Sequence, residues 1–520
     1  MKAGETESLN VLRRAKGLEF PTYGHGMKGW DETGSTGARG IALSGAMSVA
    51  GFALTAIFVF VTIISPEQFG NEWSDYHALT YLGSAIVLLS LPGIFHDARL
   101  RSSTQIYLLL GFIVAMGFSE AANGWLGGAL VTWRLFLSSS IVFFFIVANV
   151  TTARRLKMLI LTVIASCLVV VVEALCGYYL GFRGRTFLIY QHMISDRGQW
   201  GDFGRIRGAG FLSDPNDFAQ FLLIALPLTT IQWRGGRRVF NFLMVAVPAA
   251  LLMWAIFLTH SRGALVALAL LALVSIRKRF GAVLSVIFTT IAILGMFALN
   301  FTGGRLISAD AGADRLWLWA SGLEMFKRAP LFGVGFNKFA EFAELTAHNS
   351  FVLCLAELGF IGCTLWVALL VTTMMGLTRM IQVRQRYETE RSAAGNMALG
   401  EKTPSLQTAS CTFEGSAPIP IESHAAMNFQ TGIQHAFDSD VPARWIIAMR
   451  LALISFVATS WFLSRTYQST MYVILGLATA TILLDKYGDE PVARVHWVTY
   501  TLAIEAAAIA FIYFVVRFRF

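Results

Sequence analysis

Charge is scarce in this 520-residue sequence: Asp, Glu, Lys and Arg make up only 14% of it, whereas 55% is hydrophobic and the mean hydropathy is +0.60. This balance excludes an ordinary soluble globular protein. Apolar runs of about 17 to 25 residues recur along the chain, which is the length of a membrane-spanning helix, whereas barrel strands alternate over about ten residues. The sequence therefore predicts an all-α polytopic membrane protein.

Cysteine is also scarce. The five cysteines form no C-x-x-C motif, and all but Cys411 lie within apolar runs. This pattern argues against a disulfide framework and against a cysteine metal site. The loops expected outside the membrane carry no D-x-D or paired acidic motif for a divalent ion. We therefore expect no metal site and no cofactor.

The formal net charge of +9 has a simple interpretation. No soluble stretch interleaves basic and aromatic residues on a folded module, so we do not expect nucleic acid as a partner. Basic loops that face an acidic inner leaflet explain the excess better. Residues 1–39 are polar and basic and precede the first apolar run, so we expect a cytoplasmic tail and no cleavable signal peptide.

Placing that tail in the cytoplasm fixes the expected topology, because the loops then alternate as the positive-inside rule requires. We expect about 12 to 13 transmembrane helices, with an amphipathic periplasmic loop before the last few. The predicted order is a tail at 1–39, nine helices within 40–300, a periplasmic loop with an interfacial helix at 301–348, a tenth helix at 349–380, a disordered cytoplasmic loop at 381–444 and C-terminal helices at 445–520.

The predicted outer loop at 181–210 is rich in arginine and has no lysine. Five arginines face only Asp196 and Asp202 there, although short translocated loops normally avoid basic residues. Arginine suits planar, bidentate recognition of phosphate or carboxylate better than lysine does. Alternatively, some of these arginines pair with the two aspartates or with lipid headgroups. The arginines are Arg183, Arg185, Arg197, Arg205 and Arg207.

Two helix ends bring further polar groups to the same predicted side. Ser213 or Asp214 can cap the helix that follows the arginine-rich loop, and Pro215 suits its first turn. The positive end of that helix would lie beside Arg207. Arg262 lies at the outer mouth of the next helix pair. These groups together predict an anion site outside the membrane.

The segment 314–362 is the most informative part of the sequence. Apolar residues at three-to-four spacing predict an amphipathic helix that is capped at Asp314 and ends before Pro330, where a glycine-rich turn follows. His348 then precedes a long apolar run. A helix N-terminus disfavours a protonated imidazole, so His348 would be neutral and able to act as a general base. The alternative is a histidine that only caps the helix.

Six short segments on this predicted side occur in a fixed order. They are Arg207–Asn216 (RGAGFLSDPN), Thr259–Ala264 (THSRGA), Arg315 with Trp319, Pro330–Phe336 (PLFGVGF), His348–Ser350 (HNS) and Glu357–Gly362 (ELGFIG). In this order they resemble the O-antigen ligase and O-antigen polymerase superfamily. The resemblance implies a GT-C-like helical bundle and an enzyme that transfers a glycan from undecaprenyl diphosphate to an acceptor hydroxyl, without a metal and with inversion.

The resemblance also implies roles for individual residues. Arg207 and Arg262 match the arginines thought to hold the donor diphosphate, and Arg315 falls where a further arginine is usual. His348 matches the histidine proposed to activate the acceptor hydroxyl. Neighbouring polar residues are candidate supporting groups. They are Arg205, Asn216 and Asn349.

The acceptor stays open at this point. Lipid A core, as in lipopolysaccharide ligation, is the first choice because no added soluble acceptor domain follows the tenth helix; a growing glycan chain or a protein hydroxyl are the alternatives. We expect a multi-pass protein of the bacterial inner membrane, in contact with membrane lipid, whose site faces the periplasm.

Two other classes predict different outcomes. A secondary transporter would place ionisable residues near the membrane midplane, where only the scattered Glu173, Arg450 and Glu505 are candidates. A scaffold of an envelope assembly complex would tolerate replacement of Arg207, Arg262 and His348.

Overall fold

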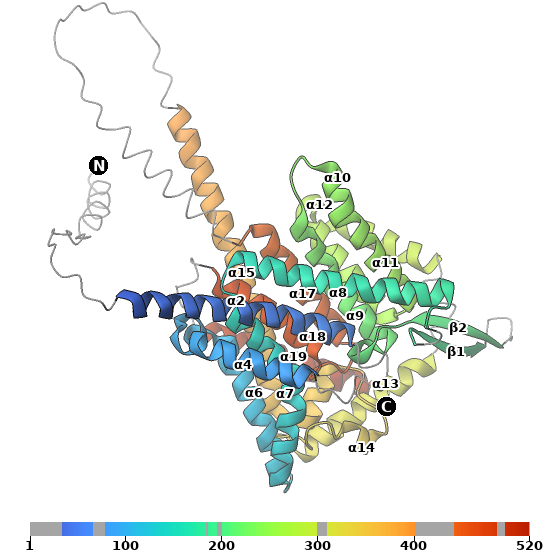
Figure 1. The fold of residues 1–520 in the computed structure, drawn as a ribbon. Coiled ribbons are helices and arrows are strands. Elements are labelled where there is room, and N and C mark those ends of the chain that lie inside the picture. Colours follow the sequence, from blue (N-terminus) through green and yellow to red (C-terminus); the bar gives the residue numbers. More distant parts are fainter. Residues whose placement is uncertain are drawn as a thin grey trace, which may run out of the picture. The chain divides into compact units, whose positions relative to one another are not determined.

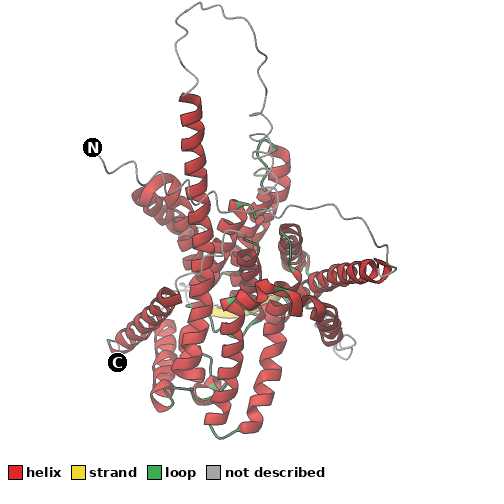
Figure 2. Ribbon diagram, turned by 90° about the vertical axis from the view of Figure 1, so that its left-hand side faces the viewer, coloured by secondary structure: helices red, strands yellow, loops and turns green. Residues whose placement is uncertain are grey.

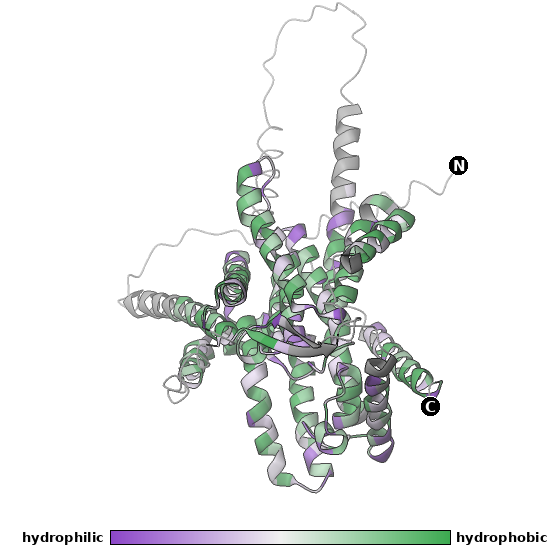
Figure 3. Ribbon diagram, turned by 90° about the vertical axis from the view of Figure 1, so that its right-hand side faces the viewer, coloured by the Kyte–Doolittle hydropathy of each residue, from purple (hydrophilic) through white to green (hydrophobic). Residues whose placement is uncertain are grey.

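The computed structural model describes residues 34–65, 78–183, 186–194, 200–298, 309–400, 441–485 and 494–518. Helices dominate these residues (Figure 2), and hydrophobic residues predominate along them (Figure 3). Nine of the helices in the described part of the chain are long and apolar enough to cross a membrane. The prediction of an all-α polytopic membrane protein is therefore confirmed at this level.

The first third of the described chain is a series of long helices (Figure 1). They are α2 (Gly34–Ile64), α4 (Ala78–His96), α5 (Ala98–Ser102), α6 (Thr104–Ala122), α7 (Leu126–Asn149) and α8 (Ala153–Leu180). The chain forms two compact units, Met1–Ala46 and Met47–Phe520. Helix α2 begins at Gly34, within the expected tail at 1–39, and its part that is apolar enough to span a membrane is Met47–Ile64. Residues 1–33 lie outside the described part.

The arginine-rich outer loop expected at 181–210 contains a β-hairpin. Strand β1 (Leu188–Ile194) pairs antiparallel with β2 (Trp200–Ile206), and Leu188 lies opposite Ile206. Ile206 is fully buried and Leu188 nearly so, which anchors the base of the hairpin against the helices. Of the five arginines, Arg185 and Arg197 lie outside the described residues.

The middle of the chain contains several short and broken helices. They are α9 (Pro215–Leu228), η3 (Thr229–Gln232), α10 (Arg238–Asn241), the π-helical η4 (Phe242–Ala246), α11 (Val247–Thr259) and α12 (Arg262–Ala298). Helix α12 consists of two helical parts joined by a kink at Gly281, where φ is 77°. Only glycine adopts that backbone conformation readily.

The last part contains the helices that carry the central segment. They are α13 (Ala309–Arg328), α14 (Phe339–Ala343), α15 (Ser350–Gly400), α17 (Ala443–Ser460), α18 (Ser469–Leu483) and α19 (Arg494–Arg517). Helix α13 begins before Asp314, which is therefore not its cap. Helix α15 continues past the predicted end at Met380, so part of the stretch expected to be disordered is helical; residues 401–440 lie outside the described part.

Helix α15 is the centre of the packing. In an apolar 18-residue window of Ser350–Arg386, 78% of the residues are buried, against 17% in the corresponding windows of α4 and α19. The large side chains of Trp366 on α15 and Tyr472 on α18 are completely buried. Helices α4 and α19 are thus peripheral, while α15 is enclosed on all sides and provides a rigid support for the residues at its N-terminus.

A bend in α15 joins two of the glycine motifs into one structural unit. At Gly359 the backbone leaves the helix, with φ of 64°. The glycine-rich turn that follows α13 fills the gap: Val334 N–H donates to the Ala356 carbonyl at 3.0 Å, and Phe360 N–H donates to the Pro330 carbonyl at 2.8 Å. The bend therefore leaves backbone groups that the turn satisfies, as buried backbone polar groups require.

The segments expected on one side of the membrane meet at one end of the helices. Three hydrogen bonds link them. These are Asn123 Nδ2 to the Gly333 carbonyl at 2.9 Å, Arg205 Nε to the Thr259 carbonyl at 2.7 Å, and Ser350 Oγ to the Leu463 carbonyl at 2.6 Å. Residues from six different parts of the sequence are thereby brought to a single region.

Candidate functional site

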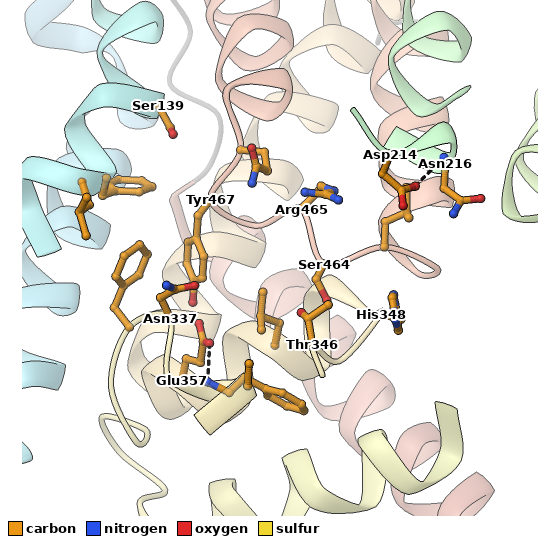
Figure 4. A pocket seen from close by; sticks show the side chains of 18 residues that line it. Ser139, Asp214, Asn216, Asn337, Thr346, His348, Glu357, Ser464, Arg465 and Tyr467 are labelled. Atoms are coloured by element: carbon orange, nitrogen blue, oxygen red, sulfur yellow. Dashed lines mark hydrogen bonds between the residues drawn. The ribbon is translucent and has the colours of Figure 1, made fainter. Parts of the chain in front are cut away.

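A cavity of about 410 Å³ opens in this region. Its walls come from α7, the start of α9, the turn before α14, the start of α15 and the loop between α17 and α18. The volume falls within the range of small-molecule sites. Figure 4 shows the polar side chains that line it. They are Ser139, Asp214, Asn216, Asn337, Thr346, His348, Glu357, Ser464, Arg465, Tyr467 and Gln468.

His348 lines this cavity immediately before α15. Its backbone is left-handed, with φ of 49°, a conformation that costs energy for a residue other than glycine and that often marks functional sites. Asn349 caps α15: its Oδ1 accepts hydrogen bonds from Phe351 N–H at 2.9 Å and Val352 N–H at 3.1 Å. The capping role, proposed above as the alternative for His348, belongs to Asn349. The cap fixes the start of α15 and so the position of the neighbouring His348.

The imidazole of His348 lies in a positive environment. Burial, then the charge of Arg315, lowers its pKa below the ordinary value; the charge of Arg465 acts in the same direction, and only Asp214 opposes them. The neutral form is therefore the one populated at neutral pH. A neutral imidazole can accept a proton, which a general base must do.

Helix α9 begins at the cavity wall, and its start is held by side chains. Asp214 is the cap: its Oδ1 accepts from Asn216 N–H at 2.7 Å. The guanidinium of Arg205 donates from Nε to the Thr259 carbonyl at 2.7 Å and from Nη2 to Asn216 Oδ1 at 3.0 Å. Arg205 is 3% exposed, so these bonds fix it between the hairpin, α9 and α11.

Arg262 and Arg315 belong to the same group of charges. A small recess beside the main cavity is lined by Arg315 and by Ser261 and Gly263, the neighbours of Arg262, and shares Asn216 with the cavity. Burial, then the charge of Arg262, lowers the pKa of the Arg315 guanidinium. Arg262 also acts to lower the pKa of Arg205. Guanidinium groups stay charged at neutral pH even so.

Close packing of α13 against α15 brings Arg315 near His348. Gly322 on α13 lies so near α15 that an added Cβ would stand 2.5 Å from Cγ1 of Val352. Leu318 and Leu323 are buried beside it. The exposed side of α13 carries Glu324, which pairs with Lys327 and Arg328. Helix α13 therefore has a buried side and an exposed side, as expected, and its buried side packs on other helices; its position at the membrane surface stays a prediction.

Arg207 lies apart from this group. Its Nε donates to the Thr186 carbonyl at 2.9 Å, so it closes the base of the hairpin, and it does not line the cavity. Arg205, two residues earlier, makes the contact with the start of α9 that was expected of Arg207, and it also contacts the end of α11. Residues two apart in a strand share a face of the sheet. Arg205 and Arg207 do not, because the strand ends at Ile206 and Arg207 lies beyond it.

Arg465 is the residue that sequence reasoning missed. It lies in the loop between α17 and α18, where its guanidinium pairs through two nitrogens with both carboxylate oxygens of Asp217. Its backbone N–H donates to Ser350 Oγ at 2.8 Å. Figure 4 shows its side chain between Tyr467 and Asp214. A single arginine in a short loop carries no sequence signal, because its partner is 248 positions away.

The charge of the region favours an anion. Four guanidinium groups lie near three carboxylates, so positive charge is in excess beside a neutral imidazole. The residues are Arg205, Arg262, Arg315 and Arg465 with Asp214, Asp217 and Glu357. Planar guanidinium groups bind phosphate oxygens in pairs and need no reorganisation when negative charge develops. In the described residues, no group of three or more His, Cys, Asp or Glu is arranged to hold a metal ion.

Comparison with known proteins identifies one part of the chain. Residues 247–367, from the start of α11 to the first third of α15, match the model of the O-antigen ligase family. The match includes Arg262, Arg315 and His348, but it does not reach Arg205 or Arg465. A search of curated proteins finds no match to the chain. The resemblance predicted from the short motifs is therefore confirmed over residues 247–367, and this part of the chain is similar to the O-antigen ligase family.

Proposed function

We propose that this protein is a glycosyltransferase that moves a glycan from undecaprenyl diphosphate to an acceptor hydroxyl on the outer face of the inner membrane. One observation carries the proposal: a half-buried, neutral histidine lines a cavity beside a group of arginines. The arginines suit the donor diphosphate and the histidine suits the acceptor. Lipid A core is the proposed acceptor; a growing glycan or a protein hydroxyl are the alternatives within this class.

The proposed reaction is a single displacement. His348 accepts the proton of the acceptor hydroxyl while the hydroxyl oxygen forms a bond to the anomeric carbon of the donor sugar. The bond from that carbon to the diphosphate oxygen breaks, and its electron pair leaves with the diphosphate. Attack opposite the leaving group inverts the anomeric carbon. His348 returns to its neutral form when the proton passes to solvent or to the departing group.

The arginines stabilise the leaving group in this proposal. Arg262 and Arg315 are the proposed contacts with the diphosphate, and Arg205 is the structural candidate for the role that the sequence analysis gave to Arg207. Fixed positive groups in a partly buried site stabilise developing charge better than water does. Asn216 and Asn349 support the arrangement by holding Arg205 and the start of α15. The reaction then needs no divalent ion.

The test is transfer in proteoliposomes. The purified native chain receives an undecaprenyl-diphosphate glycan and, in separate samples, lipid A core, a repeat-unit glycan or a serine-containing peptide, with EDTA present. We expect transfer to one acceptor, and a loss of about 10²- to 10⁴-fold in His348→Ala because a general base contributes that much. Arg262→Ala should lose transfer as well.

Arg328→Ala is the matched control. Arg328 lies on α13 like Arg315, but its side chain is 67% exposed and pairs only with Glu324. Its replacement should leave transfer unchanged. Uptake of a solute by the vesicles with no transfer to any acceptor would instead support the transporter class, and full activity of both site variants would support the scaffold.

A further inference from the structure

One end of the cavity carries polar groups that the proposed reaction does not use. Figure 4 shows Glu357, Tyr467 and Asn337 together on one side of Arg465, while His348 and Asp214 lie on the other side. Phe136 and Phe336 also line the cavity. Polar groups between aromatic rings are typical of a site that binds a ligand with both apolar and hydrogen-bonding surfaces.

Glu357 has one oxygen that the protein does not use. Its Oε1 accepts a hydrogen bond from Phe339 N–H at 2.9 Å, which fixes the side chain. Its Oε2 is buried and makes no hydrogen bond of ordinary geometry in the described part of the chain, although the Tyr467 hydroxyl and the Asn337 backbone lie close to the carboxylate. The residue is 1% exposed. An unsatisfied buried carboxylate oxygen costs free energy, so its retention in a cavity wall indicates a ligand that donates a hydrogen bond.

Tyr467 supplies a donor beside that oxygen. Its hydroxyl points toward the Glu357 carboxylate and interacts with it (Figure 4), but makes no hydrogen bond of ordinary geometry in the described residues. Burial, then the nearby carboxylate of Glu357, raises the phenol pKa well above its ordinary value, so the hydroxyl keeps its proton. The ring packs edge to face on Phe336, with centroids 4.7 Å apart.

The loop that carries Asn337 is held in a strained form. Asn337 has a left-handed backbone, with φ of 58°. Glu120 at the end of α6 fixes the residues on both sides of it: Oε1 accepts from Phe336 N–H at 2.8 Å, and Oε2 lies 3.4 Å from Lys338 Nζ. A buried ion pair and a backbone bond therefore keep the Asn337 side chain at the cavity.

We propose that this end of the cavity binds an uncharged sugar residue of the acceptor glycan. Glu357 Oε2 accepts from a sugar hydroxyl, Tyr467 and Asn337 donate to neighbouring oxygens, and the apolar face of the sugar ring packs on Phe336. The acceptor hydroxyl that reacts then lies at His348, across the cavity from the recess lined by Arg315.

The buried carboxylate also selects against acidic sugars. A uronic acid would bring a second carboxylate against Glu357 Oε2, and two carboxylate oxygens cannot hydrogen-bond each other unless one of them binds a proton, so a neutral hydroxyl fits this position better. Neutral hexoses and N-acetylated amino sugars avoid this conflict. The inference deepens the proposed function, since it names the acceptor sugar class, but its binding test does not depend on transfer.

Binding of methyl glycosides to the full chain in nanodiscs tests the inference directly. Saturation-transfer NMR would compare the methyl glycosides of glucose, galactose, mannose and N-acetylglucosamine with methyl glucuronide. We expect saturable binding of at least one neutral glycoside and none of the glucuronide at the same concentration. Binding of the glucuronide as tight as that of every neutral glycoside, or no saturable binding of any neutral glycoside, would overturn the inference.

Glu357→Gln and Tyr467→Phe are the informative variants. Glutamine keeps an oxygen for Phe339 N–H but replaces the free acceptor by a donor, and phenylalanine removes only the hydroxyl. Each should weaken the neutral glycoside about tenfold, the loss expected when a buried hydrogen bond to a substrate is left unmade. Unchanged affinity in both variants contradicts the inference.

Glu505→Gln is the matched control. Glu505 is also 1% exposed, and its carboxylate accepts from Thr364 Oγ1 at 2.6 Å, but it does not line the cavity. Its replacement should not change glycoside binding. In the transfer assay, Glu357→Gln should raise the KM for the acceptor and leave the KM for the lipid-linked donor unchanged. No transfer by the native chain, with glycoside binding intact, would instead count against the proposed function alone.

Discussion

His348 and Arg315 together determine the expected pH dependence of transfer. The folded-state pKa of His348 lies below its ordinary value because of burial and then the charge of Arg315. A general base works only when deprotonated, so activity should be present at neutral pH and fall as the pH drops through that lowered pKa. The acid limb of kcat/KM should therefore have its midpoint below about 6.5.

Replacing Arg315 by Gln should move the acid limb of the pH profile to higher pH. The variant removes a positive charge that disfavours the imidazolium, so the pKa of His348 rises toward its ordinary value and activity is lost at a higher pH. A pH profile of residual transfer, measured on native protein and Arg315→Gln, checks the sign. An acid limb that moves to lower pH, or stays in place, would contradict a base role for His348 beside Arg315.

Asp217 and Arg465 form a second pair whose energetics a mutant cycle can measure. The side chains are 6% and 22% exposed, so Asp217→Asn leaves a largely buried arginine without its carboxylate. We expect a loss of about 3 kcal/mol in the free energy of unfolding. The double variant Asp217→Asn with Arg465→Gln should regain part of that loss, since it leaves no unpaired charge.

Thermal unfolding in nanodiscs would measure the stability of the native protein, the two single variants and the double variant. The transfer assay would measure their activity. If Arg465 serves the site as well as the fold, the double variant recovers stability but not transfer. Additive stability changes, with no recovery in the double variant, would show that the two residues do not act as a pair.

At the scale of elements, the bend of α15 and the turn after α13 act as one unit. The segments PLFGVG (330–335) and ELGFIG (357–362) are separate in the sequence. Their backbones nevertheless form hydrogen bonds with each other on both sides of Gly359. Ser119 Oγ on α6 adds a hydrogen bond to the Glu357 carbonyl at 2.9 Å. The unit therefore positions the Glu357 side chain at the cavity wall.

Gly333→Ala tests this unit. Gly333 has φ of 72°, and a Cβ there would stand 2.2 Å from the Glu357 carbonyl carbon. A backbone atom cannot move aside easily, so we expect a loss of about 3 kcal/mol or more in the free energy of unfolding. Gly295→Ala is the control, because no atom lies within 4 Å of its added Cβ. Its stability should stay within about 1 kcal/mol of the native value, as expected for a helical glycine.

Thermal unfolding and protease resistance of both variants give the readout. Equal stability of Gly333→Ala and Gly295→Ala would mean that the turn tolerates a side chain and does not fix α15. Because Glu357 depends on the same unit, glycoside binding should be lost in Gly333→Ala even at temperatures where the protein stays folded.

At the scale of the whole molecule, the segments that carry the proposed site converge at one end of the helices. The positive-inside rule assigns that end to the outer face. Two exposed positions at opposite predicted faces test the assignment: Glu341 on α14 and Gly235 in the turn before α10. In a chain with Cys411 replaced by Ser, Glu341→Cys should react with a membrane-impermeant maleimide in intact spheroplasts.

Gly235→Cys should react only after the membrane is broken. The remaining native cysteines are buried or half-buried, so they contribute little background. Labelling in the opposite order would place the site on the cytoplasmic side, where a lipid-linked donor exposed on the outer leaflet does not reach it.

The sequence by itself determined the helical membrane fold and several parts of the site. Hydropathy is a local property, and a run of apolar residues must form a helix in lipid because its backbone groups have no other partners. The caps at the start of α9 and the place of His348 just before α15 are also local. So is the turn after Pro330, which needs glycine at Gly333 and Gly335 for their positive φ.

The tertiary structure alone decided which side chains meet. Arg465 reaches Asp217 across 248 positions, and no local pattern predicts such a pair. Arg205 rather than Arg207 contacts α9, because the hairpin places only one of them against the helices. In the sequence, Glu357 is only one residue of a glycine-containing motif. The bend at Gly359 and the turn packed against it place Glu357 in the cavity wall. Side-chain pairing of this kind depends on the packing of distant helices, which periodicity along the chain does not encode.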